Sequence, residues 1–340
     1  MDRVEFAKRL KTLIIPEGSS QEMIHSLTRP ISDCISQLMP NSLFRFRRFN
    51  KDSFTAFRDG LIYAVTADNF NDPYDTLARY DIEGIKSTMT AIMNCESLEQ
   101  LKEWFKQGND FPNHIKQRLP TGMAETIKTK LLSIDNVKPL ENRISDLREM
   151  MISSIEILFP ALSEISKKFL TIACFCESVQ PILMWSHYAD SHQGFALEYN
   201  FRPTLEHPQN SIGVFPVIYE EERADISSYI AWEYLFMMGV RTPNPDIFSS
   251  LKNALSKASF WAYEKEWRMI DFSPRDLTND LPSAIPYEPK AIYYGKNMSQ
   301  ENKQILHKIA QEKGINEFEM FVDYTSPLYE MKYRPAFIQQ

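Results

Sequence analysis

Polar and apolar residues alternate along residues 43–49, where Phe44 and Phe46 are each followed by an arginine, Arg45 and Arg47. A two-residue period is typical of a β-strand with one buried face. Short runs rich in β-branched and aromatic residues predict further strands. These strands are expected at residues 61–66, 170–176, 194–199, 214–219, 291–294 and 317–322.

The pattern changes to a helical period between about residues 82 and 170, where Ile144, Leu147, Met151 and Ile155 recur at helical spacing. Residues 1–41 also look helical, with breaks at the two prolines, Pro16 and Pro30. We therefore expect an α+β protein. An N-terminal helical segment (1–41) would precede one α+β domain (42–340), whose mixed or antiparallel β core is split by a helical insertion at about 82–170.

The amino-acid composition narrows the range of functions and cellular locations expected for this chain. The chain has 340 residues and is 43% hydrophobic, which is ample for a core. Its formal net charge of −7 argues against broad electrostatic binding to nucleic acid or to an anionic membrane. The beginning of the chain lacks a signal-peptide pattern, and no apolar run is long enough to span a bilayer. Four scattered cysteines fit reduced thiols. We expect a cytoplasmic protein without a membrane partner.

The first candidate site is a pair of acidic residues in the run 260–270, whose aromatic and β-branched content predicts a strand. Residues two apart share a strand face, so Glu264, Glu266 and Arg268 would point the same way. The two carboxylates would stand roughly 7 Å apart. Such a pair suits a reaction that develops positive charge, since one carboxylate can stabilise the cation while the other exchanges a proton. The alternative is a solvated face with an ion pair to Arg268.

The second candidate site is the segment 185–194, which is dense in side chains that stack or form hydrogen bonds. Trp185, Ser186, His187 and Tyr188 would form the wall of a ligand pocket, and Gly194 would allow close backbone approach where the next strand begins. The alternative is a packed corner with Trp185 and Tyr188 in the core. Histidines at positions 187 and 192 do not share a helical face, so no zinc site is expected.

Two further segments carry charged groups with possible ligand roles. Arg45 and Arg47 share a strand face and would grip a phosphate or diphosphate, unless they lie on a solvated edge. The turn FNDPYD at residues 70–75 contains Asp72 and Asp75. These acids could bind a divalent cation, although paired acids in a turn are commonly structural.

Taken in order, four motifs resemble those of a bacterial family of unknown function. They are LFRFR at 43–47, FNDPYD at 70–75, CES at 176–178 with MWSHYA at 184–189 and HQGF at 192–195, and YEKEWR at 263–268. The resemblance extends from about residue 42 to the last predicted strand, with 82–170 as a divergent insert. The family resembles the ADP-ribosyltransferase superfold, and some relatives look like toxin–antitoxin or anti-phage effectors.

The resemblance implies roles for individual residues. Arg45 or Arg47 matches the first-strand motif of the superfold, Thr66 is the hydroxyl nearest the end of the second strand, and Glu264 with Glu266 matches the late Glu-x-Glu motif. The chain departs from the arginine-specific pattern because it lacks Ser-Thr-Ser. The aromatic and histidine side chains at residues 185–188 would supply the missing wall of the ring pocket.

The resemblance therefore implies an NAD-dependent ADP-ribosyltransferase that uses NAD as substrate and needs no metal. Glu266 would stabilise the ribosyl cation formed when the nicotinamide–ribose bond breaks, and Glu264 would orient or deprotonate the acceptor. The acceptor would be a protein or nucleic acid, and an antitoxin or chaperone could be a partner. Two alternatives stay open: a non-enzymatic sensor of nucleotides or phage components, and a metal-dependent nuclease using Asp72, Asp75 and the two glutamates.

Overall fold

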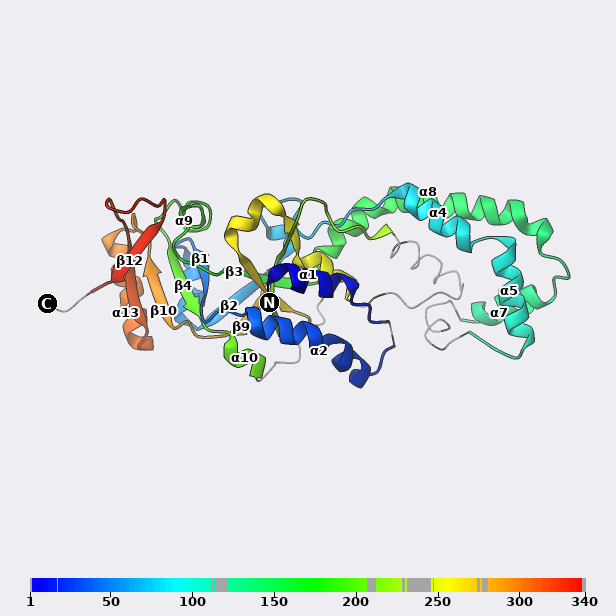
Figure 1. Cartoon of the computed structure of the whole chain (residues 1–340), viewed down its shortest axis with the longest axis horizontal. Coiled ribbons are helices and arrows are strands. Elements are labelled where there is room, and N and C mark those ends of the chain that lie inside the picture. Colours follow the sequence, from blue (N-terminus) through cyan, green and yellow to red (C-terminus); the bar gives the residue numbers. More distant parts are fainter. Residues whose placement is uncertain are drawn as a thin grey trace.

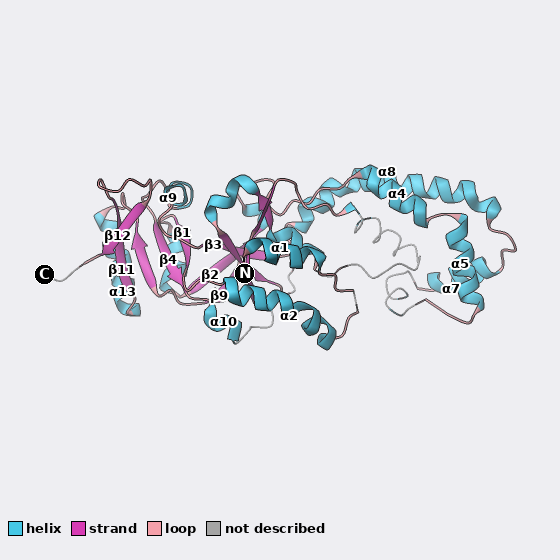
Figure 2. Ribbon diagram, viewed as in Figure 1, coloured by secondary structure: helices cyan, strands magenta, loops and turns pink. Residues whose placement is uncertain are grey.

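The computed structural model consists of a twisted, mixed sheet flanked by helices, with a long helical arm extending from it (Figures 1 and 2). The structure describes residues 2–16, 18–111, 113, 116, 121–206, 212–227, 230, 246, 248–273, 276 and 281–337. Within these residues, helices and a mixed sheet coexist without strict βαβ alternation, so the chain belongs to the α+β class.

The strands are short. They are β1 (Leu43–Arg47), β2 (Leu61–Thr66), β3 (Thr171–Cys176), β4 (Phe195–Tyr199), β5 (Ile212–Pro216), β6 (Ile218–Glu220), β7 (Ser256–Ala258), β8 (Glu266–Asp271), β9 (Ser283–Pro286), β10 (Ala291–Tyr294), β11 (Asn316–Val322) and β12 (Met331–Pro335). The strands predicted near residues 43, 61, 170, 194, 291 and 317 are confirmed, and the strand predicted at 214–219 is divided into β5 and β6.

The helices of the sheet region lie before, between and after the strands. They are α1 (Arg3–Thr12), α2 (Gln21–Leu38), α3 (Lys51–Arg58), α9 (Ile182–Tyr188), α10 (Arg202–Glu206), α12 (Ser249–Leu255) and α13 (Gln300–Lys313), with short 3₁₀ helices η1 (Ala67–Asn69) and η3 (Ser259–Glu264). The arm contains α4 (Ile82–Ile92), α5 (Cys95–Lys106), α7 (Met123–Leu132), η2 (Lys138–Leu140) and α8 (Glu141–Ser166).

The main sheet divides around β3. Its strand order is β12-β11-β10-β4-β1-β3-β2-β9, and β8 pairs with the other edge of β3 and with β5. On the edge shared by β1 and β2, Phe44 lies opposite Cys176, while Val65 lies opposite Ile172. β1 and β2 therefore pair with opposite ends of β3 and diverge between them, leaving residues 173–175 of β3 without a partner strand on that edge.

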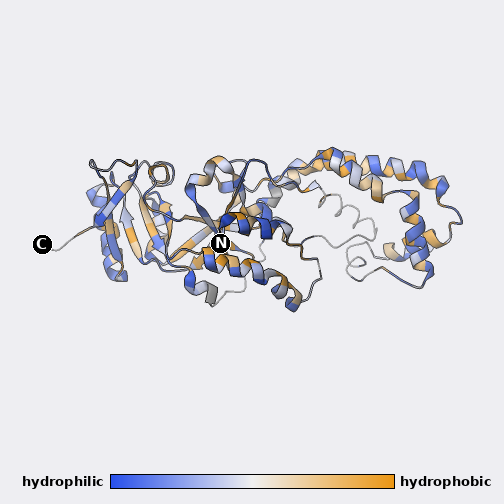
Figure 3. Cartoon of the chain, in the orientation of Figure 1, coloured by the Kyte–Doolittle hydropathy of each residue, from blue (hydrophilic) through white to orange (hydrophobic). Residues whose placement is uncertain are grey.

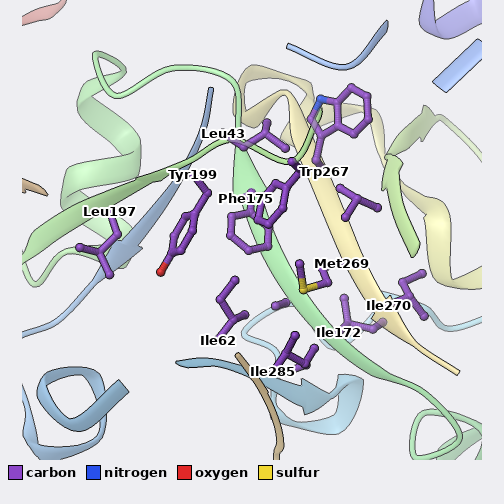
Figure 4. Close-up of a cluster of buried hydrophobic side chains, with 14 of the residues drawn as sticks. Leu43, Ile62, Ile172, Phe175, Leu197, Tyr199, Trp267, Met269, Ile270 and Ile285 are labelled. Carbon is purple, nitrogen blue, oxygen red and sulfur yellow. The ribbon is translucent and has the colours of Figure 1, made fainter. Parts of the chain in front are cut away.

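A cluster of buried hydrophobic side chains forms the core around the sheet (Figure 4). Phe175 of β3, Trp267 and Met269 of β8, and Ile285 of β9 are all buried there. Trp267 and Met269 are two residues apart, so they share one face of β8 and leave Glu266 and Arg268 on the other. This alternation fixes the direction in which the charged residues of β8 project.

The N-terminal helices pack on the same core through Phe6 and Leu10 of α1 and Ile31 and Cys34 of α2. Pro16 lies between the two helices, as expected, but the predicted break at Pro30 is wrong because Pro30 lies inside α2. Burial of the residues that follow it outweighs the lost backbone hydrogen bond.

The arm leaves the sheet after β2 and returns at β3 (Figure 1). Its α4 and α8 pack against each other through Ile85, Met89, Ile152 and Ile155, and a second cluster that includes Phe105 joins α5 to α7. Figure 3 shows hydrophilic and hydrophobic residues mixed along these helices, as amphipathic packing requires. Among the described helices, none has both the length and the apolar content needed to cross a membrane.

Candidate functional site

The divergence of β1 and β2 opens a cavity of about 410 Å³. Its walls come from segments far apart in the sequence. They are β1 and the start of α3, β2, the loop 69–75, β3, α9, Lys257 of β7, and the pair Glu264 and Glu266. The first candidate site, the arginines and part of α9 therefore meet around one space. The volume lies within the ~300–1,000 Å³ range of small-molecule sites.

Glu264 does not lie on a strand, which corrects the first prediction. Residues 259–264 form η3, Lys265 adopts the left-handed conformation with φ of 44°, and β8 begins only at Glu266. A non-glycine residue with positive φ breaks the two-residue alternation on which the shared-face argument depended. Only Glu266 and Arg268 are related by strand geometry.

A residue that the sequence analysis did not identify brings the two glutamates together. The Lys257 ammonium donates to Glu264 Oε2 at 2.6 Å and to Glu266 Oε2 at 2.7 Å. The side chains of all three residues are at most 5% exposed. A buried ammonium between two carboxylates relieves the repulsion that would otherwise separate them, so Lys257 defines the acidic end of the cavity.

Arg268 forms hydrogen bonds with the carboxylates of Glu266 and Asp75. Its guanidinium is fully buried and donates to Glu266 Oε1 at 2.8 Å, to Asp75 Oδ2 at 2.7 Å and to the carbonyl oxygen of Ala254 at 2.6 Å. Asp75 belongs to the loop 69–75 and also lines the cavity. The ion-pair network therefore connects the loop before the arm, β7 and β8.

The environments of the carboxylates move their pKa values apart. Burial raises the pKa of Glu264, with the negative charge of Glu266 adding to the effect, and burial also raises the pKa of Asp75. Burial would raise the pKa of Glu266 too, but Arg268 and Lys257 outweigh it and hold that pKa well below its usual range. The pKa values of two neighbouring carboxyl groups are thus shifted in opposite directions, which is a common arrangement where one exchanges a proton and the other stays charged.

Arg3 of α1 fixes the beginning of β8. Its guanidinium donates to the carbonyl oxygens of Val217 and Glu266, both at 2.9 Å, and to the Glu177 carboxylate at 2.8 Å. The backbone N–H of Glu266 donates to the hydroxyl of Tyr219 at 2.7 Å. The N-terminal helix therefore helps to position the cavity, although its sequence carries no candidate motif.

The predicted ligand wall at α9 is divided between cavity and core. Tyr188 lines the cavity and donates to Glu264 Oε1 at 2.7 Å, and the exposed His187 lies beside it. Trp185 is fully buried, donates to the Val179 carbonyl and packs edge-on against Phe46, so it belongs to the core. Ser186 does not line the cavity either, because its hydroxyl bonds back to the carbonyl of Ile182. The helical turn of α9 is the reason, since it directs successive side chains to different sides.

The turn after α9 is strained and closely packed. Asp190, Ser191 and His192 all have positive φ, from 49° to 70°, which is unfavourable for residues with a side chain. At Gly194, a Cβ atom would lie 2.1 Å from the carbonyl oxygen of Arg47. The predicted need for a glycine at this position is therefore confirmed, and the turn holds α9 directly beside β1.

Both arginines of β1 line the cavity. Arg45 donates to the Tyr63 carbonyl of β2 at 2.6 Å and so bridges the divergent strands. Burial, and then the charge of Arg47, lower the pKa of Arg45 to about 9, and burial also lowers the pKa of Arg47. Among the described residues, no carboxylate forms an ion pair with either arginine, and none pairs with Arg48 at the same wall. This end of the cavity therefore has an excess of positive charge.

Thr66 lies outside the cavity, which corrects its predicted place in the site. Its hydroxyl is buried at the end of β2, where it donates to Asp68 and accepts from Asn69. Asp72 is likewise engaged elsewhere: its Oδ2 accepts from Trp261 and its Oδ1 from the backbone of Tyr74. Thr66 and Asp72 therefore stabilise turns.

The sequence analysis missed the role of Lys257 and the position of Asp75 at the wall of the cavity. Lys257 lies seven residues before Glu264 in an unremarkable context, and no local pattern relates it to the acids. Asp75 was considered only as a metal ligand or a turn residue. The signal available for it was the motif FNDPYD, which marked the loop without revealing that Arg268 would be its partner.

Comparisons with known proteins identify part of this site. Residues 184–269 match the model of a family described as “Protein of unknown function (DUF2971)”. The matched span begins in α9 and ends in β8, so it contains the motifs MWSHYA and YEKEWR and the residues Lys257, Glu264 and Glu266. No curated protein and no solved structure matches the chain. From α9 to β8, the chain is therefore similar to a family whose function is unknown.

Proposed function

We propose that this protein is an NAD-dependent ADP-ribosyltransferase that transfers ADP-ribose to a macromolecular acceptor, a protein or a nucleic acid. The observation that carries the proposal is the polarity of one cavity. It joins an arginine-lined end without carboxylate partners to an end where two carboxylates have opposite pKa shifts. NAD combines a diphosphate with a glycosidic bond whose cleavage develops positive charge.

The arginine end supports binding of the diphosphate. A half-buried guanidinium without a counter-ion is unfavourable. A bound phosphate would supply the missing negative charge and relieve the repulsion between Arg45 and Arg47. Arg45 is already committed to the Tyr63 carbonyl, so Arg47 is the stronger candidate for direct contact. Arg48, which is exposed at the same wall, adds positive charge at the mouth.

The acidic end supports the chemistry of transfer. When the bond between nicotinamide and ribose breaks, its electron pair leaves with the neutral nicotinamide, and the ribose carbon becomes cationic. Glu266 stays ionised and faces this region, so it stabilises the cation. Glu264, with its raised pKa, takes the proton that the acceptor loses as it bonds to the ribose carbon. Tyr188 and His187 form the wall against which the nicotinamide ring packs.

The arrangement of the sheet is compatible with the ADP-ribosyltransferase superfold that the motifs resemble. A first-strand arginine (Arg45 or Arg47) and the late glutamates face one cavity between divergent strands. Thr66 is not part of that cavity, so the second-strand hydroxyl of the superfold has no counterpart here. Within the same proposal, the protein acts as a toxin or anti-phage effector in the cytoplasm, with an antitoxin or chaperone as its partner.

The test is NAD turnover by matched carboxamide variants. Glu266→Gln and Glu264→Gln should lower nicotinamide release from NAD by about 10²–10⁴-fold. Glu198→Gln is the control, because Glu198 is a buried carboxylate of β4 that does not line the cavity. Mass spectrometry of lysate proteins and nucleic acids incubated with NAD would then identify the acceptor. Equal NAD consumption by wild type and Glu266→Gln would refute the assignment.

A non-enzymatic sensor is the second candidate, and one observation favours it. All four carboxylate oxygens of Glu264 and Glu266 already accept hydrogen bonds from the protein. Such a saturated network suits a rigid binding site. Saturable NAD binding without nicotinamide release would support the sensor.

The nuclease alternative is disfavoured. In the described residues, the space between Asp75, Glu264 and Glu266 is occupied by the cationic groups of Lys257 and Arg268. A divalent cation bound there would have to displace them.

A further inference from the structure

Asp75 carries a buried oxygen that the protein leaves without a partner. Its side chain is 3% exposed and lines the cavity. Oδ2 accepts from Arg268 at 2.7 Å, whereas Oδ1 has no hydrogen-bond partner. A buried acceptor without a donor is unfavourable by about 1–3 kcal/mol, so nearly all such atoms in native proteins bind something.

Asp72, three residues earlier in the same loop, shows that this situation is particular to Asp75. Asp72 is also buried, but both of its oxygens accept hydrogen bonds, from the indole of Trp261 at 2.8 Å and from the Tyr74 backbone at 2.8 Å. Asp72 does not line the cavity. Both carboxylate oxygens of Asp72, which lies outside the cavity, therefore have hydrogen-bond donors, whereas one oxygen of the cavity-lining Asp75 has none.

Lys257 provides a donor near the carboxylate of Asp75. An ammonium has three N–H groups, and two of them are used by Glu264 and Glu266. The distance from Lys257 Nζ to Asp75 Oδ2 is 3.8 Å, which is too long for a hydrogen bond. The third N–H has no oxygen or nitrogen acceptor among the described residues, and the ring of Trp261 lies 5.1 Å from Nζ.

We propose that Asp75 Oδ1 and the remaining N–H of Lys257 together bind a sugar hydroxyl of the ligand. A hydroxyl donates one hydrogen bond and accepts others at a single atom, so it can serve an acceptor on Asp75 and a donor on Lys257 at once. A phosphate would be repelled by Asp75, and a metal ion would be repelled by Lys257. The inference rests on the proposed function to the extent that ribose is the sugar, and it assigns the recognition of that ribose to Asp75.

Asp75→Asn tests the assignment while preserving the fold. The network now holds three carboxylates (Asp75, Glu264 and Glu266) and two cations, so an asparagine at this position leaves two of each. Its carbonyl oxygen can still accept from Arg268, and its NH₂ group then replaces Oδ1, which reverses the hydrogen-bonding character toward the ligand. Asp72→Asn is the matched control in the same loop.

Isothermal titration calorimetry with ribose 5-phosphate and with inorganic phosphate separates the hydroxyl contribution from that of the arginines. Wild type and Asp72→Asn should bind ribose 5-phosphate at least about tenfold more tightly than phosphate, and Asp75→Asn should lose about tenfold or more of that affinity without weaker phosphate binding. Circular dichroism and thermal unfolding check that each variant is folded.

Each other outcome overturns the inference. If the wild type binds ribose 5-phosphate and phosphate with equal affinity, or binds neither, the proposed hydroxyl site is refuted by the wild-type data alone. Unchanged affinity in Asp75→Asn means that only water meets Oδ1, and equal losses for both ligands point to a change of fold. Selective binding of ribose 5-phosphate without NAD turnover would refute the proposed transferase activity but would still support the hydroxyl site at Asp75.

Discussion

Replacing Lys257 by methionine is the most informative perturbation of the site. Methionine keeps the apolar stem but removes the ammonium that two carboxylates share at 2.6 and 2.7 Å. Glu264 and Glu266 would then lie close together in a buried site without the cation between them. Removing one partner of a buried ion pair typically lowers stability by about 3–5 kcal/mol. Because the total stability of a domain is about 5–15 kcal/mol, the loss should be large but measurable.

The loss should depend on pH in a defined direction. Lys257 lowers the pKa of Glu264, so its removal raises that already elevated pKa further. A carboxyl group whose pKa is raised on folding contributes stability that is complete below its unfolded value, near 4.5, and is lost as the pH rises through the folded value. Proton uptake by Glu264 therefore offsets more of the lost ion pair near pH 5 than near pH 8.

The measurement is urea unfolding of wild type and Lys257→Met at pH 5 and pH 8, with Lys303→Met as the control. Lys303 is also buried, but its single ion-pair partner, Glu319, is 3.5 Å away and 28% exposed, so its replacement should lower stability by about 1 kcal/mol or less. A Lys257→Met loss no larger than the control at pH 8, or one that does not shrink at pH 5, would refute the reasoning.

Three further predictions concern the surroundings of the cavity. Arg47→Ala should weaken ribose 5-phosphate binding about tenfold by calorimetry, with unfolding free energy unchanged within about 0.5 kcal/mol, because no carboxylate pairs with Arg47. Ser191→Gly should be neutral or stabilising by up to about 1 kcal/mol in thermal unfolding, because φ at Ser191 is 51° and glycine adopts positive φ without strain. The control Ser186→Gly lies inside α9 and should destabilise the protein by about 0.5–1 kcal/mol. Equal effects of the two substitutions would contradict the proposed strain at Ser191. Arg3→Ala should lower stability by about 1–3 kcal/mol through its three lost hydrogen bonds. Arg9→Ala, which removes a half-exposed i, i+4 pair, should lower it less, and a reversed order would argue against the role of Arg3.

Local sequence patterns were sufficient to predict most of the strands and the need for a glycine at position 194. The alternation around Phe44 and Phe46 identified β1 because a half-buried strand must alternate. Gly194 could be predicted because close backbone contact excludes a Cβ atom, which is a local requirement. These features follow from the period of the backbone and from the absence of a side chain, both of which can be seen in a single sequence.

The site itself depends on contacts between distant segments, which a local pattern does not contain. Glu264 was predicted on a strand because its neighbours favour strands, yet the left-handed Lys265 separates it from β8. Its true relation to Glu266 comes through Lys257, and that of Asp75 comes through Arg268, 193 residues away. Likewise Trp185 looked suited to stacking on a ligand, but the helical turn of α9 directs it into the core.

The position of the helical arm has an evolutionary and engineering consequence. The arm departs after Thr66 and rejoins the sheet at Thr171, and these two residues lie opposite each other in neighbouring strands. Its two ends are thus almost as close as those of a hairpin turn, so the length between them can vary without changing the order or register of the sheet. Grafts or deletions confined to the end of the arm formed by α5 and α7, whose hydrophobic cluster contains only residues of the arm, should be tolerated by the rest of the molecule, making this the natural place to attach a reporter.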